Sequence, residues 1–276
     1  MILHAPAKLN LCLYLGQTRE DGLHELCSLF EPLSLADLLE VTDGEGEDGV
    51  LCDGVAGENL AARALGELRA RGWSAPPRRV RIEKRIPVAA GLGGGSADAA
   101  AVLRLGRGEV EGLEEAAAAL GADVPSQLLP SFALVRGAGE RVERLPAPAR
   151  HGLVLLPGGG GLPTGEVFAA ADRLGLGRGR EELDDLSRRL REAAGGGASP
   201  LEYAELLVND LEPAALSLRP EIAAALEALR GAGAARALMS GSGPTVFGLF
   251  ADLGSARAAA ERLGRDDAIV CGGADR

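Results

Sequence analysis

The stretch that decides the fold is Pro87-Val88-Ala89-Ala90-Gly91-Leu92-Gly93-Gly94-Gly95-Ser96-Ala97-Asp98. An alternating segment leads into it, and an Ala-rich segment that predicts a helix follows it. Four glycines within five residues let the backbone adopt positive φ and approach a ligand closely. The helix start would offer free N–H groups and the positive end of its dipole. The pattern favours a polyphosphate cradle in which Ser96 contacts phosphate or Mg²⁺, with a capped flexible turn as the alternative.

Two familiar nucleotide loops do not fit this stretch. A Walker A loop needs GxxxxGK[ST], and no Lys follows the glycines here. A dinucleotide fingerprint belongs to an N-terminal βαβ unit with an acidic ribose ligand about 20 residues later, and that context is missing. The loop therefore belongs to another class.

Length, charge and hydropathy set wider limits. The chain has 276 residues, 46% of them hydrophobic, and a formal net charge of −11. Such an acidic chain is a poor candidate for coating nucleic acid. No long uncharged apolar window and no basic leader are visible, so neither a membrane helix nor a signal peptide is expected. The four cysteines are widely spaced, which favours buried thiols in a soluble, cytoplasmic protein over a zinc site.

Lysine is almost absent from this chain. Of 29 basic residues only Lys8 and Lys84 are lysines, and the other 27 are arginines. Asparagine is nearly as scarce, with only Asn10, Asn59 and Asn209. Positions that keep a residue avoided elsewhere are candidates for a specific role.

Hydrophobic periodicity predicts an α+β chain of two domains. A Pro-rich segment at 146–150 predicts a linker, so the domains are expected at 1–148 and 149–276. In the first, strands are predicted at 9–15 (half-buried), 29–35, 38–42, 50–52, 78–85, 132–135 and 141–145, and helices at 58–71, 96–105 and 113–120. In the second, strands are predicted at 151–156, 237–240, 245–251 and 268–271, and helices at 165–174, 181–194, 201–207, 220–229 and 255–263. Without its extra helices, the second half reads β-α-β-β-α-β, which is the ferredoxin-like order.

Three stretches resemble the GHMP small-molecule kinases. The glycine loop resembles their second motif, Ala5-Pro6-Ala7-Lys8-Leu9-Asn10-Leu11 their first, and Met239-Ser240-Gly241-Ser242-Gly243-Pro244-Thr245 their C-terminal motif. Within this superfamily, further stretches resemble the family of 4-diphosphocytidyl-2-C-methyl-D-erythritol kinases: Arg19-Glu20-Asp21-Gly22-Leu23-His24-Glu25-Leu26, Leu120-Gly121-Ala122-Asp123-Val124-Pro125, and residues 58–60, 162–164 and 208–210.

The resemblance implies a two-domain GHMP kinase fold. Its N-terminal, ATP-binding domain would resemble domain 2 of ribosomal protein S5, and its C-terminal domain would be ferredoxin-like. The implied activity is ATP- and Mg²⁺-dependent phosphorylation of the 2-hydroxyl of the cytidine-diphosphate-linked tetrol, in the non-mevalonate isoprenoid pathway. It also implies a monomer or homodimer with no nucleic-acid or membrane partner.

By resemblance, Asp123 is the catalytic base and Lys8 stands beside it. The acceptor hydroxyl must lose a proton, which a placed carboxylate can accept. A neighbouring ammonium keeps that carboxylate ionised and can contact the reacting phosphate. The residues alone also allow Asp123 to be a helix cap and Lys8 a solvated strand-edge lysine.

The resemblance also assigns the binding residues. Those for ATP are Asn59 and Lys84 around the adenine and the loop 87–97 around the phosphates. Those for the substrate are Asn10, His24 at the cytosine, Thr164, Phe168 stacked on the base, Gly241 and Gly243. The residues alone leave alternatives: Lys84 as a surface cation beside Arg85, Phe168 as an ordinary core residue and His24 as a structural histidine.

The chain departs from the family at four positions. Leu23 stands where the family usually has Tyr, Ser126-Gln127 where it has two aromatics, and Ala97 where Ser is commoner. These departures bear on substrate affinity more than on phosphoryl transfer. The competing hypotheses are another GHMP kinase such as a homoserine or mevalonate kinase, a non-catalytic nucleotide-binding regulator, and an S5-like nucleic-acid module.

Overall fold

A computed structural model describes residues 1–54 and 59–274. The chain forms two compact units. The first comprises Met1–Lys8, Leu35–Val88 and Gly93–Pro130, and the second comprises Leu9–Ser34, Ala89–Leu92 and Ser131–Arg276. The domain boundary near residue 149 stays a prediction. Both units combine helices with strands, which confirms the α+β class.

Two long strands, β1 (Ile2–Thr18) and β2 (His24–Asp43), contribute residues to both units. β2 replaces the two separate strands predicted at 29–35 and 38–42. Asp37 lies in the gap between those two predictions, and its buried carboxylate pairs with Lys84, which is far away in the sequence. β1 is not the half-buried strand expected from its alternation, because Cys12 and Tyr14 are buried as well as the leucines between them.

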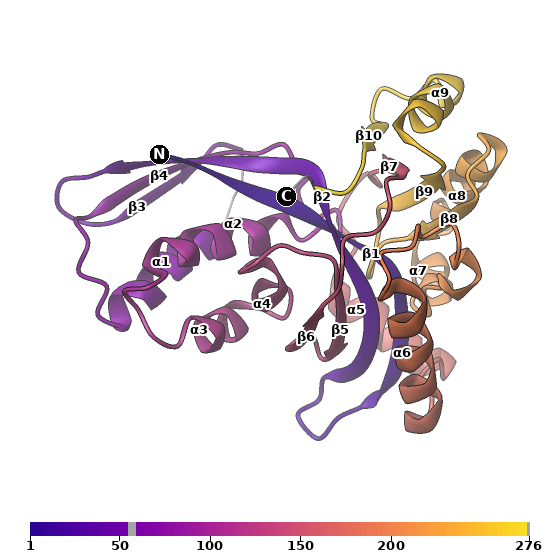
Figure 1. Ribbon diagram of the computed structural model, residues 1–276, viewed down its shortest axis with the longest axis horizontal. Coiled ribbons are helices and arrows are strands. Elements are labelled where there is room, and N and C mark those ends of the chain that lie inside the picture. Colours follow the sequence, from indigo (N-terminus) through magenta and orange to yellow (C-terminus); the bar gives the residue numbers. More distant parts are fainter. Residues whose placement is uncertain (55–58, 275–276) are drawn as a thin grey trace. The chain divides into compact units, whose positions relative to one another are not determined.

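In the first unit, four helices lie on one side of a small sheet (Figure 1). Residues Leu38–Asp43 of β2 pair antiparallel with β4, which pairs in parallel with β3. The elements are β3 (Gly49–Cys52), α1 (Leu60–Ala70), β4 (Arg78–Glu83), α2 (Gly94–Leu103), the 3₁₀ helix η1 (Arg104–Gly106), α3 (Leu113–Leu120) and α4 (Val124–Gln127). The predicted helix 58–71 is thus confirmed from residue 60, and residue 58 lies outside the described part. Small buried alanines let α2 sit inside the core of this unit.

The second unit contains the ferredoxin-like sheet. Its strand order is β10-β7-β9-β8 and every neighbouring pair is antiparallel. Residues Leu26–Phe30 of β2 also pair with β5, which forms a hairpin with β6. The elements are β5 (Ala133–Gly137), β6 (Arg141–Arg144), β7 (Gly152–Leu156), α5 (Thr164–Leu174), α6 (Arg180–Ala194), the 3₁₀ helix η2 (Ala204–Leu206), α7 (Glu212–Leu218), α8 (Ile222–Gly231), β8 (Arg236–Met239), β9 (Val246–Phe250), α9 (Leu253–Leu263) and β10 (Ile269–Cys271).

The β-α-β-β-α-β prediction is therefore confirmed, with α6, α7 and α8 as additions to it. The helix predicted at 201–207 is wrong, because only the short η2 forms there. α7 was missed, since Pro213 breaks the pattern in sequence but is tolerated in the first turn of a helix.

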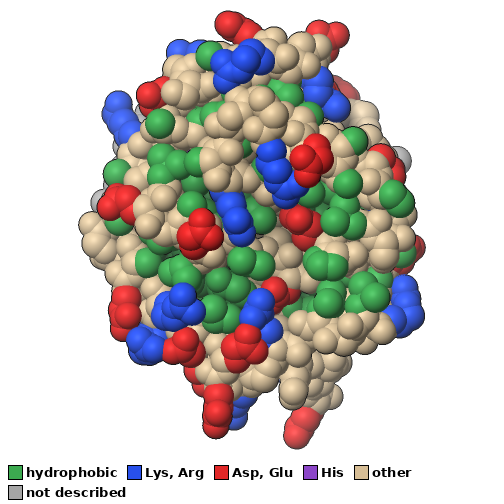
Figure 2. All heavy atoms as spheres, turned by 90° about the vertical axis from the view of Figure 1, so that its right-hand side faces the viewer, with side chains coloured by type: hydrophobic (Ala, Val, Ile, Leu, Met, Phe, Trp, Pro, Cys, Tyr) green, Lys and Arg blue, Asp and Glu red, His purple; other side chains and the backbone are tan. Residues whose placement is uncertain are grey.

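Figure 2 shows one face of the molecule, where acidic and basic side chains are interspersed with small hydrophobic patches. Within the described part of the chain, no helix is long and apolar enough to cross a membrane. In the same part, no group of three or more His, Cys, Asp or Glu side chains is arranged to hold a metal ion.

Candidate active site

The glycine loop ends in the first unit, where α2 begins. Gly93 precedes the helix with φ of +68° and gives it no side-chain cap. The first helical bond runs from Ala97 N to Gly93 O, so the N–H groups before Ala97 stand ahead of the helical ladder. Uncapped N–H groups and the helix dipole favour an anion at this point. Ser96 is the first hydroxyl residue inside the helix and is partly exposed.

Lys8 and Asp123 come together in the first unit. Lys8 Nζ lies 3.3 Å from Asp123 Oδ2. The Lys8 side chain is 8% exposed and that of Asp123 is 33% exposed. Lys8 is therefore not a solvated strand-edge lysine. Asp123 precedes α4, but its side chain does not cap that helix. The carboxylate is thus held by an ammonium on one side and is open to a reactant on the other.

Lys8 lies on β1, and Asp123 directly precedes α4. Two further side chains connect these two elements. Arg104 donates to the carbonyl oxygens of Gln127 and His4, at 3.0 and 2.7 Å. Gln127 Nε2 donates to Pro6 O at 3.4 Å. Ser126 Oγ donates to Asp123 O at 2.8 Å and steadies the turn itself. Ser126 and Gln127, which depart from the family pattern, therefore donate hydrogen bonds to backbone carbonyl oxygens near the reactive pair.

Lys84 lies in a different environment of the same unit. Its Nζ contacts Asp37 Oδ2 at 2.5 Å and Asp98 Oδ2 at 2.9 Å. Asp37 is fully buried and Asp98 nearly so. Burial alone would lower the pKa of Lys84, but the two carboxylates outweigh it and raise that pKa. Burial raises the pKa of Asp98 despite the attraction of Lys84. The interpretation of Lys84 as a surface cation beside Arg85 is wrong.

Both lysines of the chain lie against consecutive glycines of the loop. A Cβ on Gly93 would stand 2.8 Å from Lys8 Cγ, and one on Gly94 would stand 3.2 Å from Lys84 Nζ. Only glycine permits the first of these approaches, because its φ is also positive. The two ammonium groups, each with its carboxylate partners, thus lie in one part of the first unit beside the start of α2.

Asn59 lies at the start of α1, also in the first unit. Its Oδ1 accepts a hydrogen bond from Ala61 N at 2.8 Å and caps the helix. Its carbonyl oxygen is therefore occupied by the helix. Its assignment to the adenine pocket stays a prediction.

The second unit brings together His24 and Phe168. Their ring centres are 5.0 Å apart and the planes are tilted by 43°. His24 Nε2 also lies 2.7 Å from Asp172 Oδ1 and 3.2 Å from Thr18 Oγ1. Phe168 and Asp172 are four residues apart on α5, so they share a helix face. Leu23, beside this group, is 53% exposed, so it supplies an apolar surface in place of an aromatic ring.

Thr164 meets the C-terminal glycine motif within the same unit. Its Oγ1 lies 3.0 Å from Ser242 Oγ. Asn209 Nδ2 donates to Met239 O and Gly241 O, at 2.7 and 2.8 Å, and so shapes the turn. Gly243 has φ of +80°, and a Cβ there would meet Met239 Sδ at 2.5 Å. The glycines thus allow the turn to close.

Asn10 is buried in the second unit, where its backbone N–H contacts a side chain of the same motif. Its Nδ2 donates to Ser28 Oγ at 2.8 Å, and its N–H donates to Ser240 Oγ at 3.2 Å. The nearby loop residues 89–92 also belong to this unit, and Gly91 leaves room for Gly243 O, which a Cβ would approach to 2.6 Å. A contact of Asn10 with substrate stays a prediction.

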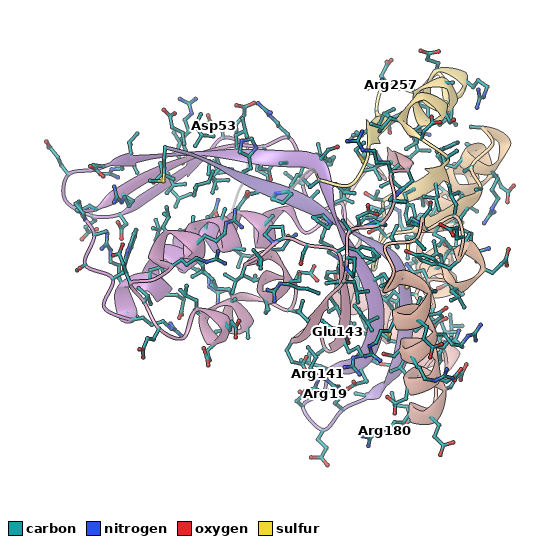
Figure 3. All side chains as sticks on the ribbon, in the orientation of Figure 1. Arg19, Asp53, Arg141, Glu143, Arg180 and Arg257 are labelled. Carbon is teal, nitrogen blue, oxygen red and sulfur yellow. The ribbon has the colours of Figure 1, made fainter. Side chains whose placement is uncertain are left out.

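Arginine is used differently from lysine in this chain. In the second unit, Arg141 pairs with Glu25, and Arg191 Nε pairs with Glu143 Oε1 at 2.6 Å. Figure 3 labels Arg141 and Glu143, which both belong to β6. Both arginine side chains are more than a third exposed. Exposed pairs of this kind contribute little to stability, about 0–1 kcal/mol.

Some residues of the site escaped the sequence interpretation. Asp37, Asp98 and Arg104 are fold-dependent partners of the lysines and of α4, and their spacing in the chain carried no signal. Asp172 could have been found, because it follows Phe168 by four residues in a predicted helix.

Comparisons with known proteins agree with this geometry. The family models "GHMP kinases N terminal domain" and "GHMP kinases C terminal" match residues 59–127 and 181–268. A 4-diphosphocytidyl-2-C-methyl-D-erythritol kinase from Pelotomaculum thermopropionicum is 42% identical over 95% of this chain and 93% of the relative.

Solved structures extend the comparison. A crystal structure of 4-(cytidine 5'-diphospho)-2C-methyl-D-erythritol kinase matches with a TM-score of 0.79 and 40% identity, covering 100% of both chains. A homoserine kinase from Cytophaga hutchinsonii has a TM-score of 0.68 but only 19% identity, covering 99% of this chain and 93% of that one, and so shares the fold alone. The chain therefore belongs to the 4-diphosphocytidyl-2-C-methyl-D-erythritol kinase family of the GHMP kinases.

Proposed function

We propose that this chain transfers the γ-phosphoryl group of ATP to the 2-hydroxyl of 4-diphosphocytidyl-2-C-methyl-D-erythritol. The observation that carries the proposal is the pair of Lys8 and Asp123 beside Gly93, at the uncapped start of α2. A base, a cation and an anion-binding helix end are the groups that phosphoryl transfer requires. The family relationship supplies the nature of the acceptor.

In this mechanism Asp123 accepts the proton of the acceptor hydroxyl as the oxygen attacks the γ-phosphorus. The new O–P bond forms while the bond from the γ-phosphorus to the β,γ-bridging oxygen breaks, and ADP leaves. Lys8 lies beside this carboxylate and stabilises negative charge on the transferring group. The N–H groups at the start of α2 hold the phosphates.

For the second unit we propose recognition of the cytosine by His24 and Phe168. A ring of Phe168 size can supply about 1–3 kcal/mol by stacking on a base. Asp172 and Thr18 fix the orientation of the imidazole through Nε2. Thr164 and the turn at Gly241 and Gly243 are proposed to contact the rest of the substrate.

Mg²⁺ is proposed to accompany ATP. The partly exposed hydroxyl of Ser96 in the first turn of α2 fits such an ion, because Mg²⁺ takes few protein ligands and is held largely by phosphate oxygens and water. When bound, it would neutralise charge on the phosphates. Ser96 is the hydroxyl placed to contact a phosphate or the ion. We further propose a cytoplasmic location and a monomer or homodimer, as the family resemblance suggests.

The deciding experiment measures ADP release with the cytidyl tetrol, homoserine and mevalonate offered separately. We expect turnover with the cytidyl tetrol and at least a hundredfold lower kcat/KM with the other two. Turnover with homoserine or mevalonate alone would overturn the proposed acceptor.

A further inference from the structure

A buried charge cluster in the first unit has two acids for one base. Asp37, Lys84 and Asp98 have side chains that are 0%, 15% and 4% exposed. One ammonium cannot neutralise two carboxylates in a medium that solvates charge poorly, and burial accordingly raises the pKa of Asp98. Such clusters are costly, and well-packed apolar residues often replace them without loss of stability. Stability alone is therefore a weak reason for this arrangement.

The cluster connects three segments of the unit. Asp37 lies on β2, Lys84 directly follows β4, and Asp98 lies on α2. Asp37 Oδ1 also accepts hydrogen bonds from the N–H groups of Arg85 and Ile86, at 2.6 and 2.8 Å. The chain entering the glycine loop is thereby held at its backbone as well as at the Lys84 side chain.

The ammonium of Lys84 is aimed at the start of α2. It stands 3.2 Å from the position of a Cβ on Gly94, the first residue of that helix. Without a ligand, a cation at the positive end of a helix dipole is unfavourable. The neighbouring carboxylates offset that repulsion, so the cation can remain beside a site that binds anions.

Two polar groups of the cluster have further capacity. Asp98 is 3% exposed, and in the described part of the chain its Oδ1 has no hydrogen-bond partner. Lys84 has three N–H donors. Within the described part of the chain, it donates hydrogen bonds to the carboxylates of Asp37 and Asp98. One N–H of Lys84 and the Oδ1 atom of Asp98 can therefore form a further hydrogen bond beside the start of α2.

We propose that Asp37 and Asp98 are positioning residues of the nucleotide site, which fix the Lys84 ammonium and the start of α2 for ATP. The inference rests on the proposed function, in that the start of α2 is taken to bind the nucleotide. Asp37 holds the incoming chain, and Asp98 holds α2 to the same ammonium. Loosening either tie moves the helix N–H groups relative to Lys84 and weakens nucleotide binding, while the acceptor site is unaffected.

The test compares Asp98→Ala, Asp98→Asn and Asp37→Asn with the wild-type chain. ADP affinity is measured by titration calorimetry without acceptor, and kcat and both KM values are measured by ADP release. We expect Asp98→Ala to raise the Kd for ADP and the KM for ATP at least tenfold. The KM for the acceptor should change less than twofold. Asp98→Asn should recover part of the affinity, because its amide oxygen still accepts from Lys84.

Glu31→Gln is the matched control. Glu31 is a buried acid of the second unit that pairs with His151, and it undergoes the same change from carboxylate to amide. It should lose stability, measured by thermal unfolding, without any change in ADP affinity. If Asp98→Ala does not fold, Asp98→Asn and Asp37→Asn decide the question, with an expected three- to tenfold loss of ADP affinity.

Wild-type ADP affinity in the folded aspartate variants would overturn the proposal. So would an equal loss of ADP affinity in Glu31→Gln, because the effect would then follow stability. Wild-type chain that binds ADP yet fails to phosphorylate the cytidyl tetrol would overturn the proposed function instead. In that case the calorimetry still tests the role of Asp37 and Asp98.

Discussion

The two lysines of this chain lie against neighbouring glycines, yet they have different partners. Lys8 faces Asp123, whose carboxylate is one-third exposed. Lys84 is held between two carboxylates that are almost fully buried. A partner that is open to solvent can also be reached by a reactant, whereas a buried partner cannot. The comparison suggests that the first pair reacts and that the second cluster holds the site in place.

The same contrast explains why lysine and arginine are not interchangeable here. A lysine presents a compact charge at the end of a thin stem, and Arg presents a planar fork of five donors. The Lys8 stem passes directly over Gly93. Arginine instead occupies exposed ion pairs such as that of Arg188 with Asp185 and Glu192. Where arginine serves the site, as Arg104 does, its planar fork bridges two carbonyl oxygens.

Lys8→Arg tests the reactive role of the Lys8–Asp123 pair. The guanidinium cannot follow the same path over Gly93, so the charge beside Asp123 is displaced. We expect kcat to fall about 10²- to 10⁴-fold, the range typical of a placed acid–base group. Steady-state ADP release measures this. Arg188→Lys, the reverse exchange at the surface, should leave kcat unchanged. A less than threefold loss in Lys8→Arg would contradict the reactive role.

Lys84→Arg tests the cluster of Asp37, Lys84 and Asp98, which is proposed to hold the nucleotide site in place. The larger head group does not fit between Asp37 and Asp98 beside Gly94. We expect the KM for ATP to rise about tenfold while kcat changes less than threefold, because the group acts in binding more than in the transition state. The two constants come from the same ADP-release assay. A fall in kcat with an unchanged KM for ATP would place Lys84 with the reactive pair.

Arg104→Lys tests whether the connection between β1 and α4 positions the Lys8–Asp123 pair, because it loosens that connection alone. An ammonium cannot bridge His4 O and Gln127 O in the way that the guanidinium does. We expect kcat to fall three- to tenfold, since small misplacements of reacting groups reduce the rate. The KM for ATP should stay within twofold of the wild-type value. An unaltered kcat would show that the bridge does not position Asp123.

Glu31→Gln provides a pH test on a buried pair of the second unit to which no catalytic role is assigned. Burial opposes charging of His151, but the hydrogen bond that His151 donates to the Glu31 carboxylate outweighs it and raises the pKa of His151. The resulting stability is complete below the ordinary histidine value of about 6.5 and is lost as the pH rises through the raised pKa.

The Glu31→Gln variant should therefore be less stable than wild type by about 1–3 kcal/mol at pH 6, as expected for a hydrogen bond to a charged group. The difference should shrink above pH 8. Chemical denaturation at the two pH values measures it. A difference that does not change with pH would mean that His151 stays neutral throughout.

Much of the fold was predictable, because local patterns decide it. Hydrophobic periodicity and the positions of glycine and proline predict the glycine loop, most helices and the order β7-α5-β8-β9-α9-β10. The length of β2 was not predictable, because Asp37 falls between the two strands predicted at 29–35 and 38–42. Its partner, Lys84, is brought to it only in the folded chain.

The candidate site divides in the same way. Lys8 and Asp123 were predicted together from the family resemblance, and the structure brings them within 3.3 Å. His24 and Phe168 were likewise predicted and are in contact. Arg104 was not predicted, because nothing distinguishes it from the other arginines of the chain before its carbonyl partners are seen. Asp98 was hidden in the same way, as one polar residue in an alanine-rich helix.

The most direct test of the account is Asp123→Asn. The amide keeps the shape of the side chain but cannot take the proton of the acceptor hydroxyl. Calorimetry should give an ADP affinity within threefold of wild type, because Lys84 and the start of α2 are unchanged. ADP release with the cytidyl tetrol should fall at least a hundredfold. Turnover close to that of wild type would contradict the assignment of Asp123 as the base.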